Sequence, residues 1–195
     1  MDGFQRRREQ KKLDILDASL NLFLKYGIQK VSISEIAKEA NVSQVTIYNY
    51  FENKHKLIQE AFIYYVDKTM NEFEKVLNAE IPYPEKIKSI IFNKKEAATE
   101  INKEFYEYMM KQYSTEGNYI EQVYAQKALP AFIQLFEEGK QQGYVDPNLS
   151  NEAILFYVQM LKEYFQQEHV YQKAFPLTEE IASIFFYGVL GKRDH

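Results

Sequence analysis

The sequence predicts an all-α protein, and three observations lead to this class. Glycine and proline are scarce in the 195 residues, 7 and 5 respectively, and they cluster where the apolar pattern breaks. Between these breaks the apolar residues recur every three or four positions, without the alternation typical of strands. Hydrophobic residues make up 46% and charged residues 27%, which suits a chain that buries a sizeable core. No internal repeat or low-complexity segment is present.

The first helix is expected from Glu9 to Tyr26, ending at Gly27, because glycine tolerates the positive φ of a helix C-terminus. One apolar stripe on it comprises Ile15, Leu16, Ser19, Leu22, Phe23 and Tyr26. A second stripe, on another side, comprises Leu13, Leu20 and Leu24. A helix that is apolar on two sides is packed on two sides, so we expect it to touch more than its own small domain.

A short helix is expected next, with Ser32 or Ser34 as its N-cap. Its apolar residues follow the helical spacing i, i+3, i+4, i+7: Ile33, Ile36, Ala37 and Ala40. The run ends at Asn41, one of the few non-glycine residues that accept the left-handed conformation.

A second short helix, residues 44–51, follows after only three residues, and Ser43 caps it. A link of this length is typical of a helix-turn-helix. Val42 is placed to fill the corner of the turn, and the small Ala37 allows the two helices to cross closely.

The second short helix has one inward face and one outward face. Ile47 and Phe51 lie together on it and must face the core. The other side and its flanks carry Gln44, Val45, Thr46, Tyr48, Asn49 and Tyr50. Amides can pair with adenine and valine can meet a thymine methyl group, whereas hydroxyls and the nearby Lys54 suit backbone phosphates. The alternative is that Tyr48 and Tyr50 are simply half-buried aromatics.

Longer helices rich in Tyr and Phe are expected in the rest of the chain. The 16 Tyr and 14 Phe lie mostly beyond residue 60. The expected helices span residues 54–79, 85–113, 118–142, 150–168 and 178–190. Pro130 lies inside the third of these, so a kink or a break is expected there.

The charge is unevenly distributed, although the whole chain has a net charge of −4. Residues 1–60 hold ten Lys and Arg against eight Asp and Glu, a net charge of +2, and the remainder carries −6. The basic cluster consists of Arg6, Arg7, Arg8, Lys11 and Lys12. Such a cluster suits phosphates, although basic runs are often only solvated.

Several classes of protein are disfavoured by what the sequence lacks. Without cysteine there is no disulfide, no thiolate zinc site and no Cys nucleophile, and His55, His169 and His195 are the only imidazoles. No apolar run approaches the length of a membrane span, and no secretory signal follows the N-terminus, so a cytoplasmic protein is expected. No catalytic cluster or Gly-rich phosphate loop is visible, so no enzyme activity, cofactor or metal is expected.

Three segments carry a motif with intact spacing. They read Ile15-Leu16-x-Ala18-Ser19-x-x-Leu22-Phe23-x-x-x-Gly27, Ser32-Ile33-Ser34-x-Ile36-Ala37-x-x-Ala40-Asn41-Val42-Ser43 and Thr46-Ile47-Tyr48-x-Tyr50-Phe51-x-x-Lys54-x-x-Leu57. Over residues 9–62 the chain resembles the DNA-binding domain of the TetR (tetracycline repressor) family. Asn41 stands where the family usually has Gly, and because Asn also accepts positive φ the departure is small.

The resemblance implies a two-domain helical homodimer that binds a palindromic DNA operator. The DNA-binding domain would cover residues 1–60 and the ligand-binding and dimerisation domain residues 61–195. The base-reading residues would be Gln44, Val45, Tyr48 and Asn49, and the phosphate-binding residues Ser32, Ser34, Thr46, Tyr50 and Lys54. Arg6 to Arg8 are an open case: they either reach DNA as a flexible arm or are solvated. His55 is expected to be exposed rather than a pH sensor.

The resemblance also places an effector pocket and a dimer interface in the second domain. The pocket candidates are Phe105, Tyr106, Met109, Met110, Tyr113, Phe132, Phe136 and Tyr157, although a Met or aromatic stripe at helical spacing is more often plain core. The effector would be lipophilic, and Glu104 and Glu107 leave a cationic one open. The last two helices are too apolar for one subunit, and their dimer candidates are Ala153, Phe156, Tyr157, Met160, Leu161, Tyr164, Ile181, Ile184 and Phe185.

The leading hypothesis is therefore a transcriptional repressor that a small-molecule effector releases from DNA. Effector and DNA would oppose each other through a reciprocal coupling free energy. The alternatives are an activator, a regulator switched by a protein partner without a small-molecule effector, and a helical enzyme or carrier that merely contains the motif.

Overall fold

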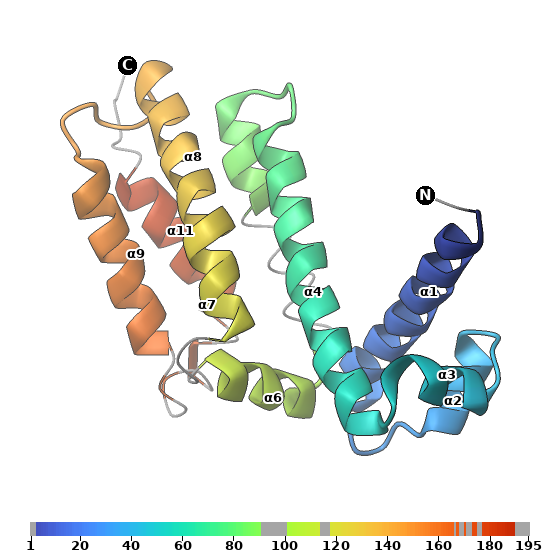
Figure 1. Ribbon diagram of the computed structural model, residues 1–195. Coiled ribbons are helices and arrows are strands. Elements are labelled where there is room, and N and C mark those ends of the chain that lie inside the picture. The colour runs from blue at the N-terminus through green and yellow to red at the C-terminus, as the bar shows by residue number, and fades with distance from the viewer. Residues whose placement is uncertain are drawn as a thin grey trace. The chain divides into compact units, whose positions relative to one another are not determined.

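A computed structural model describes residues 3–90, 101–113, 118–165, 167, 170, 173–174 and 177–189 (Figure 1). This part of the chain contains helices and no strand, so the all-α prediction is confirmed. The helices are α1 (Gly3–Tyr26), α2 (Ile33–Glu39), α3 (Gln44–Phe51), α4 (Lys54–Leu77), α6 (Lys103–Tyr113), α7 (Tyr119–Val123), the π-helical turn η1 (Tyr124–Ala128), α8 (Leu129–Gln141), α9 (Asn151–Phe165) and α11 (Thr178–Val189). Residues 83–90 are also helical. None of the described helices is both long and apolar enough to cross a membrane.

The chain divides into two compact units, and α4 contributes to both. The first unit comprises Met1–Thr69 with Glu100–Lys111, and the second comprises Met70–Thr99 with Gln112–His195. By this division, the first two-thirds of α4 and most of α6 belong to the first unit. The domain boundary expected after residue 60 stays a prediction.

The core of the first unit forms around α1. Ile15 and Phe23 are fully buried, and so is Ser19. The Ser19 hydroxyl is satisfied in this position, because its Oγ donates to the Ile15 carbonyl at 2.7 Å. Leu20, from the second predicted stripe, is buried as well, whereas Leu13 and Tyr26 are exposed. α1 is therefore packed on two sides over its C-terminal half, as its sequence predicts.

The segment that leads into α6 is attached to the turn after α1. Asn102 N–H donates to the Leu24 carbonyl at 2.7 Å, and both Glu104 carboxylate oxygens accept from Gln29 N–H at 3.1 and 3.2 Å. Gly27 has a φ of 86° here, and a Cβ would lie 2.5 Å from Glu104 Oε2. The predicted continuous helix over 85–113 is wrong at residues 101–102, because that backbone bonds to α1 instead of continuing a helix.

The second unit contains a partly buried ion pair at the end of α4. Lys86 Nζ lies 3.0 Å from both carboxylate oxygens of Glu138 and donates to the Leu77 carbonyl at 2.8 Å. That carbonyl belongs to the last residue of α4, where the helix offers no N–H of its own. Lys86 thereby joins the end of α4 to α8 and to helix 83–90.

The break expected at Pro130 takes the form of the π-helical turn η1. Proline has no N–H, and its ring clashes with the carbonyl four residues earlier, so a regular α-helix cannot continue through it. Just before it, Leu129 N–H donates to the Tyr124 carbonyl five residues back. The helical path is kept from α7 to α8, with a wider turn in between.

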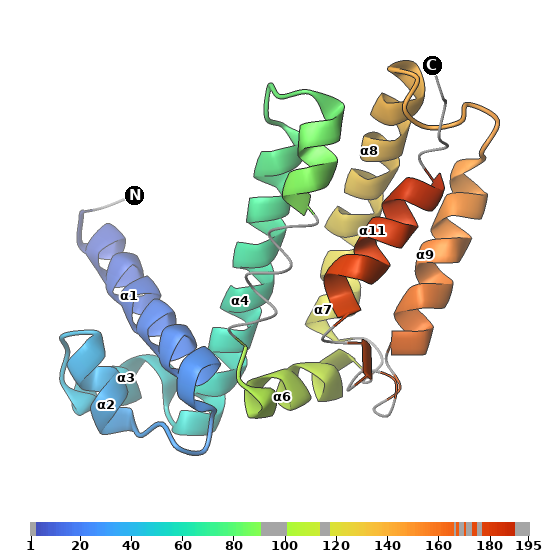
Figure 2. The same ribbon diagram turned by 180° about the vertical axis from the view of Figure 1, so that it is seen from behind.

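Aromatic rings connect α8, α9 and α11 in the second unit. Phe185 of α11 lies with its ring centre 6.2 Å from Phe136 of α8 and stacks on Tyr157 of α9 at 5.7 Å. In Figure 2, α11 (red) lies beside α8 and α9 accordingly. One side of α9 and α11 nevertheless stays apolar and exposed.

We expect Gly139→Ala to lower the free energy of unfolding by about 1–3 kcal/mol, because the added methyl overpacks the unit. A Cβ on Gly139 would lie 2.5 Å from Tyr83 Oη and 2.6 Å from Val145 Cγ2. Tyr83 and Val145 are each 1% exposed and have little room to move. Urea unfolding measures the effect.

The matched control is Gly188→Ala in α11, where nothing lies within 4 Å of the added Cβ. This change should be neutral or stabilise by roughly 0.5–1 kcal/mol, since alanine favours helix. Equal stability of the two variants would contradict the packing of α8.

Candidate nucleic-acid interface

The turn between α2 and α3 is built by local hydrogen bonds. Ser43 caps α3, with its Oγ accepting from Thr46 N–H at 3.0 Å. Asn41 has a φ of 52°, so it adopts the left-handed conformation expected of it. Val42 packs on the core, and its N–H donates to the Ala37 carbonyl at 2.9 Å. The predicted helix-turn-helix is thus present, with its corner filled by Val42.

A capping box fixes the start of α2. Ser32 Oγ accepts from Glu35 N–H, and the Ser32 backbone N–H donates back to Glu35 Oε2 at 2.7 Å. Capping of this kind stabilises a helix by about 1 kcal/mol. Ser32 is therefore the N-cap, and Ser34 is an exposed residue of the first turn.

α3 turns one face into the core and the other into solvent. Ile47 and Phe51 are each 1% exposed. Val45 is 67% and Tyr48 47% exposed, which is unusual for large apolar side chains and puts them on the outer face. The four predicted base-reading residues are all exposed: Gln44, Val45, Tyr48 and Asn49. Tyr48 is therefore not a half-buried aromatic.

Three of the predicted phosphate-binding side chains already have partners inside the protein. Thr46 Oγ1 lies 2.8 Å from Ser43 Oγ, Tyr50 Oη donates to the Arg8 carbonyl at 3.2 Å, and Lys54 Nζ donates to the Ile28 carbonyl at 2.8 Å. All three residues are half-buried, so for Tyr50 the half-buried alternative holds. Their contact with DNA stays a prediction, and the ammonium group of Lys54 keeps two further N–H donors for it.

The basic N-terminus is helical, not a flexible arm. α1 begins at Gly3, six residues earlier than predicted, and includes Arg6 to Arg8. Two contacts with α3 hold it there, the hydrogen bond of Tyr50 to the Arg8 carbonyl and the Arg8 guanidinium 5.9 Å from the Tyr50 ring centre. Of the two cases left open for Arg6 to Arg8, the flexible arm does not hold, because the backbone of residues 3–8 is part of the helix that continues to Tyr26. Contact of these residues with DNA stays a prediction.

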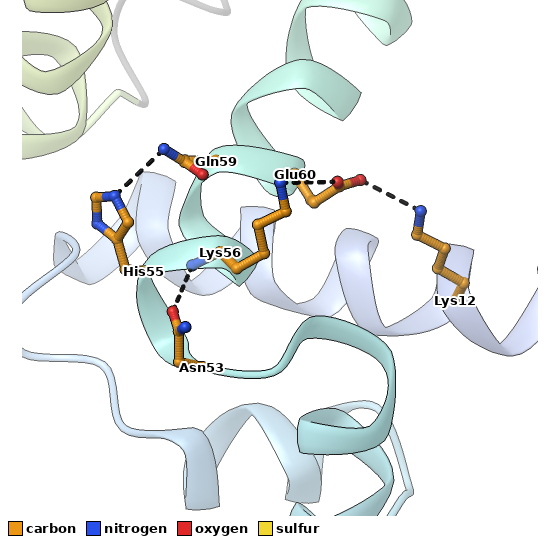
Figure 3. Close-up of polar contacts among 6 residues, drawn as sticks. All are labelled: Lys12, Asn53, His55, Lys56, Gln59 and Glu60. Carbon is orange, nitrogen blue, oxygen red and sulfur yellow. Dashed lines mark hydrogen bonds and ion pairs between the residues drawn. The ribbon is translucent and has the colours of Figure 1, made fainter.

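The start of α4 is bonded to α1 (Figure 3). Glu60 accepts from Lys12 Nζ at 3.2 Å, and Asn53 Oδ1 accepts from Lys56 N–H at 2.9 Å. His55 is exposed and lies 3.2 Å from the Gln59 amide nitrogen, as expected for a solvated side chain. Lys12 is therefore engaged by a carboxylate, unlike Arg7 and Lys11.

The surface formed by α3 has the chemistry for reading DNA. It offers two amides, a small apolar group and a phenol, on a helix narrow enough for the major groove. In the described ranges no group of three His, Cys, Asp or Glu residues is placed to hold a metal ion.

The family model described as "Bacterial regulatory proteins, tetR family" matches residues 15–61, which span the C-terminal part of α1, the helix-turn-helix and the start of α4. The N-terminal part of the chain is therefore similar to the DNA-binding part of the TetR family. Its helix-turn-helix is accordingly the DNA-binding motif of a family of transcriptional regulators.

The curated relatives are similar to this chain over its N-terminal part. An uncharacterized HTH-type transcriptional regulator of Bacillus subtilis, YuxN, is 39% identical over 71 residues, which are 36% of this chain and 23% of the relative. The first relatives are matched over only 23% to 44% of their own length.

Two solved structures share the whole fold. The fatty acid degradation regulator FadR of Bacillus halodurans superimposes with a TM-score of 0.56 at 21% identity, over 90% of this chain and 97% of that one. FadR of Bacillus subtilis, solved in complex with stearoyl-CoA, gives a TM-score of 0.57 at 18% identity, over 91% and 98%. At these identities the likeness shows the fold, a helix-turn-helix followed by a helical domain.

The predicted effector-pocket residues differ in their burial within each unit, and their role in a pocket stays a prediction. Phe105 is fully buried in the core of the first unit, edge-on to Tyr65 at 5.7 Å, so the structure places it in packing rather than in a pocket. Tyr106, Met109 and Met110 are half-buried on α6. In the second unit, Phe136 is buried core and Phe132 is half-buried 5.2 Å from Phe73. The side chain of Tyr113 lies outside the described residues.

The predicted dimer residues lie on α9 and α11, mostly exposed. Phe156 and Ile184 are each 68% exposed, whereas Phe185 is buried in its own subunit. The exposed members are Ala153, Phe156, Tyr157, Met160 and Tyr164, and the half-buried ones are Leu161 and Ile181. A groove of about 390 Å³ in this surface is lined by several of them, and Lys173 lines it as well. Tyr187, 66% exposed, extends the same apolar surface and was not predicted.

We expect the capping box to stabilise the fold less at acid pH, where the Glu35 carboxylate becomes protonated. Hydrogen bonds from the Ser32 hydroxyl and then from the Ser32 backbone N–H hold the pKa of Glu35 below its usual 4.5. A carboxyl group with a lowered pKa stabilises the fold above its unfolded pKa, and this is lost as the pH falls through the folded value. Wild type should therefore exceed Glu35→Gln in urea midpoint at neutral pH, and the two should converge as the pH falls below 4.5 and through the lowered folded pKa of Glu35. A difference independent of pH would contradict this.

Proposed function

We propose that the chain is a sequence-specific DNA-binding transcriptional regulator that represses from a palindromic operator. The observation that carries the proposal is the outer face of α3, where Val45 and Tyr48 are exposed while Ile47 and Phe51 anchor the helix. Such side chains have no packing role in this subunit, and their types match the edges of A·T-rich base pairs. The family assignment supports the same function.

The regulator acts as a homodimer in this proposal. Large apolar residues on α9 and α11 are up to 68% exposed, which favours a second copy as their cover. A twofold dimer presents two recognition helices to two half-sites, so its operator is an inverted repeat.

A lipophilic small molecule releases the repressor from DNA in this proposal. The support is the half-buried Tyr106, Met109 and Met110 on α6, together with the fold shared with a regulator solved with stearoyl-CoA. Adaptable methionines and aromatic rings suit acyl chains. Long-chain acyl-CoA is accordingly the first compound to add to a protein–DNA complex, and release by it would favour this effector over a protein partner.

The decisive experiment is selection of bound duplexes from a randomised DNA library by the purified protein. We expect enrichment of an inverted repeat, and a folded dimer that enriches nothing would overturn the proposal. Selection with Tyr48→Ala should give a changed consensus at positions contacted by α3, with a loss of about 1–3 kcal/mol on the original duplex. An unchanged consensus and affinity would remove Tyr48 from the reading face.

We expect Ile184→Glu to yield a monomer, because a charge on the apolar surface of α11 opposes its burial by a second copy. Val45→Glu is the matched control: Val45 is 67% exposed against 68% for Ile184, but it lies on α3. Sedimentation velocity should show a dimer for Val45→Glu and a monomer for Ile184→Glu. A dimeric Ile184→Glu protein would place the interface elsewhere.

A further inference from the structure

A groove of about 610 Å³ lies between the N-terminal turns of α1 and the end of α3. Arg7, Arg8 and Lys11 line it from α1, and Asn49 and Tyr50 from α3. Asp14 is the one carboxylate among the residues that line it, and it accepts from Gln10 Nε2 at 2.9 Å. The groove is therefore cationic on a chain whose net charge is −4.

The cations of the groove belong to one face of α1. Phe4, Arg7, Arg8 and Lys11 follow the spacing i, i+3, i+4, i+7, which aligns their side chains along the helix. In the part of the chain that the structure describes, no hydrogen bond or ion pair engages the Arg7 guanidinium or the Lys11 ammonium group. Both groups are exposed and available to an anion.

The groove is continuous with the outer face of α3. Asn49 belongs to both, being exposed on the recognition helix and lining the groove. The hydrogen bond from Tyr50 Oη to the Arg8 carbonyl holds the two walls together, and the Arg8 guanidinium lies against the Tyr50 ring. An anion in the groove would thus lie at a set position relative to the bases that α3 faces.

We propose that this groove holds backbone phosphates of the DNA strand that flanks the bases read by α3. The inference rests on the proposed function. Duplex DNA carries one negative charge per about 1.7 Å of its axis, so a strand beside α3 presents regularly spaced phosphates to a row of cations. Arg7 and Lys11 bind the phosphates, while Arg8 and Tyr50 act as positioning residues that hold α1 against α3. These interactions strengthen binding to any sequence and carry no base preference.

The test compares Arg7→Ala/Lys11→Ala with wild type on two probes, the duplex enriched by selection and a random-sequence duplex of equal length. We expect the salt slope to fall by about one unit for each phosphate that the variant no longer binds. Affinity should fall by the same factor on both probes, more than about tenfold near 0.1 M salt. Far-ultraviolet circular dichroism confirms that the exposed alanine substitutions leave α1 folded.

The matched control compares Arg6→Ala with Arg7→Ala, because Arg6 lies on the same helix but does not line the groove. Both substitutions remove one positive charge, so a general attraction to DNA would respond to them equally. Arg6→Ala should have clearly the smaller effect on affinity and on the salt slope.

Three results would overturn the inference. One is that the Arg7→Ala/Lys11→Ala variant binds DNA with the affinity of wild type, while the Tyr48→Ala variant still loses affinity for the selected duplex. Another is an equal loss for Arg6→Ala and Arg7→Ala, which would show general attraction rather than a site. The third is a loss confined to the selected duplex or to A·T-rich flanks, which would show base reading. A wild-type protein that retains no duplex at all would instead mean that the proposed function itself has failed.

Discussion

The outer surface of the first unit depends on the burial of one face of an eight-residue helix. Two turns of helix are not stable in water without packing, so α3 exists because Ile47 and Phe51 are almost completely buried. Burial of each contributes roughly 2 kcal/mol. The same burial fixes the rotation of the helix about its axis, and this rotation decides that Val45, Tyr48 and Asn49 face solvent.

The helix-turn-helix was predictable from the sequence because its determinants are local. Ser43 caps α3 through a backbone N–H three residues away, and Asn41 provides the left-handed residue of the turn. The exposure of Val45 and Asn49 follows from the burial of Ile47 and Phe51, since helical geometry puts them on the opposite side of α3. The start of α1 was predicted six residues too late, with Arg6 to Arg8 left open between an arm and a solvated run, although the spacing of Phe4, Arg7, Arg8 and Lys11 was already that of a helix face.

The partners of polar side chains were not predictable, because they lie far away in sequence. Lys54 bonds to the Ile28 carbonyl and Tyr50 to the Arg8 carbonyl, and no local pattern indicates either hydrogen bond. Asn102 N–H donates to the Leu24 carbonyl just before α6 begins, so a continuous apolar pattern over 85–113 predicted too long a helix. Phe105 was predicted to line a pocket because the sequence does not show its neighbours in the core, which come from α1 and α4.

The π-helical turn has a consequence for the alignment of the two helices that it joins. Buried residues of α7 are Ile120 and Val123, and those of α8 include Ala131, Leu135 and Phe136. At about 100° per residue, an unbroken α-helix would leave these two sets out of phase by roughly one residue. The wider turn η1 absorbs that residue, so both sets can face the same core. The chain here accommodates what amounts to a one-residue insertion inside a helix, without a loop and without exposing either apolar face to water.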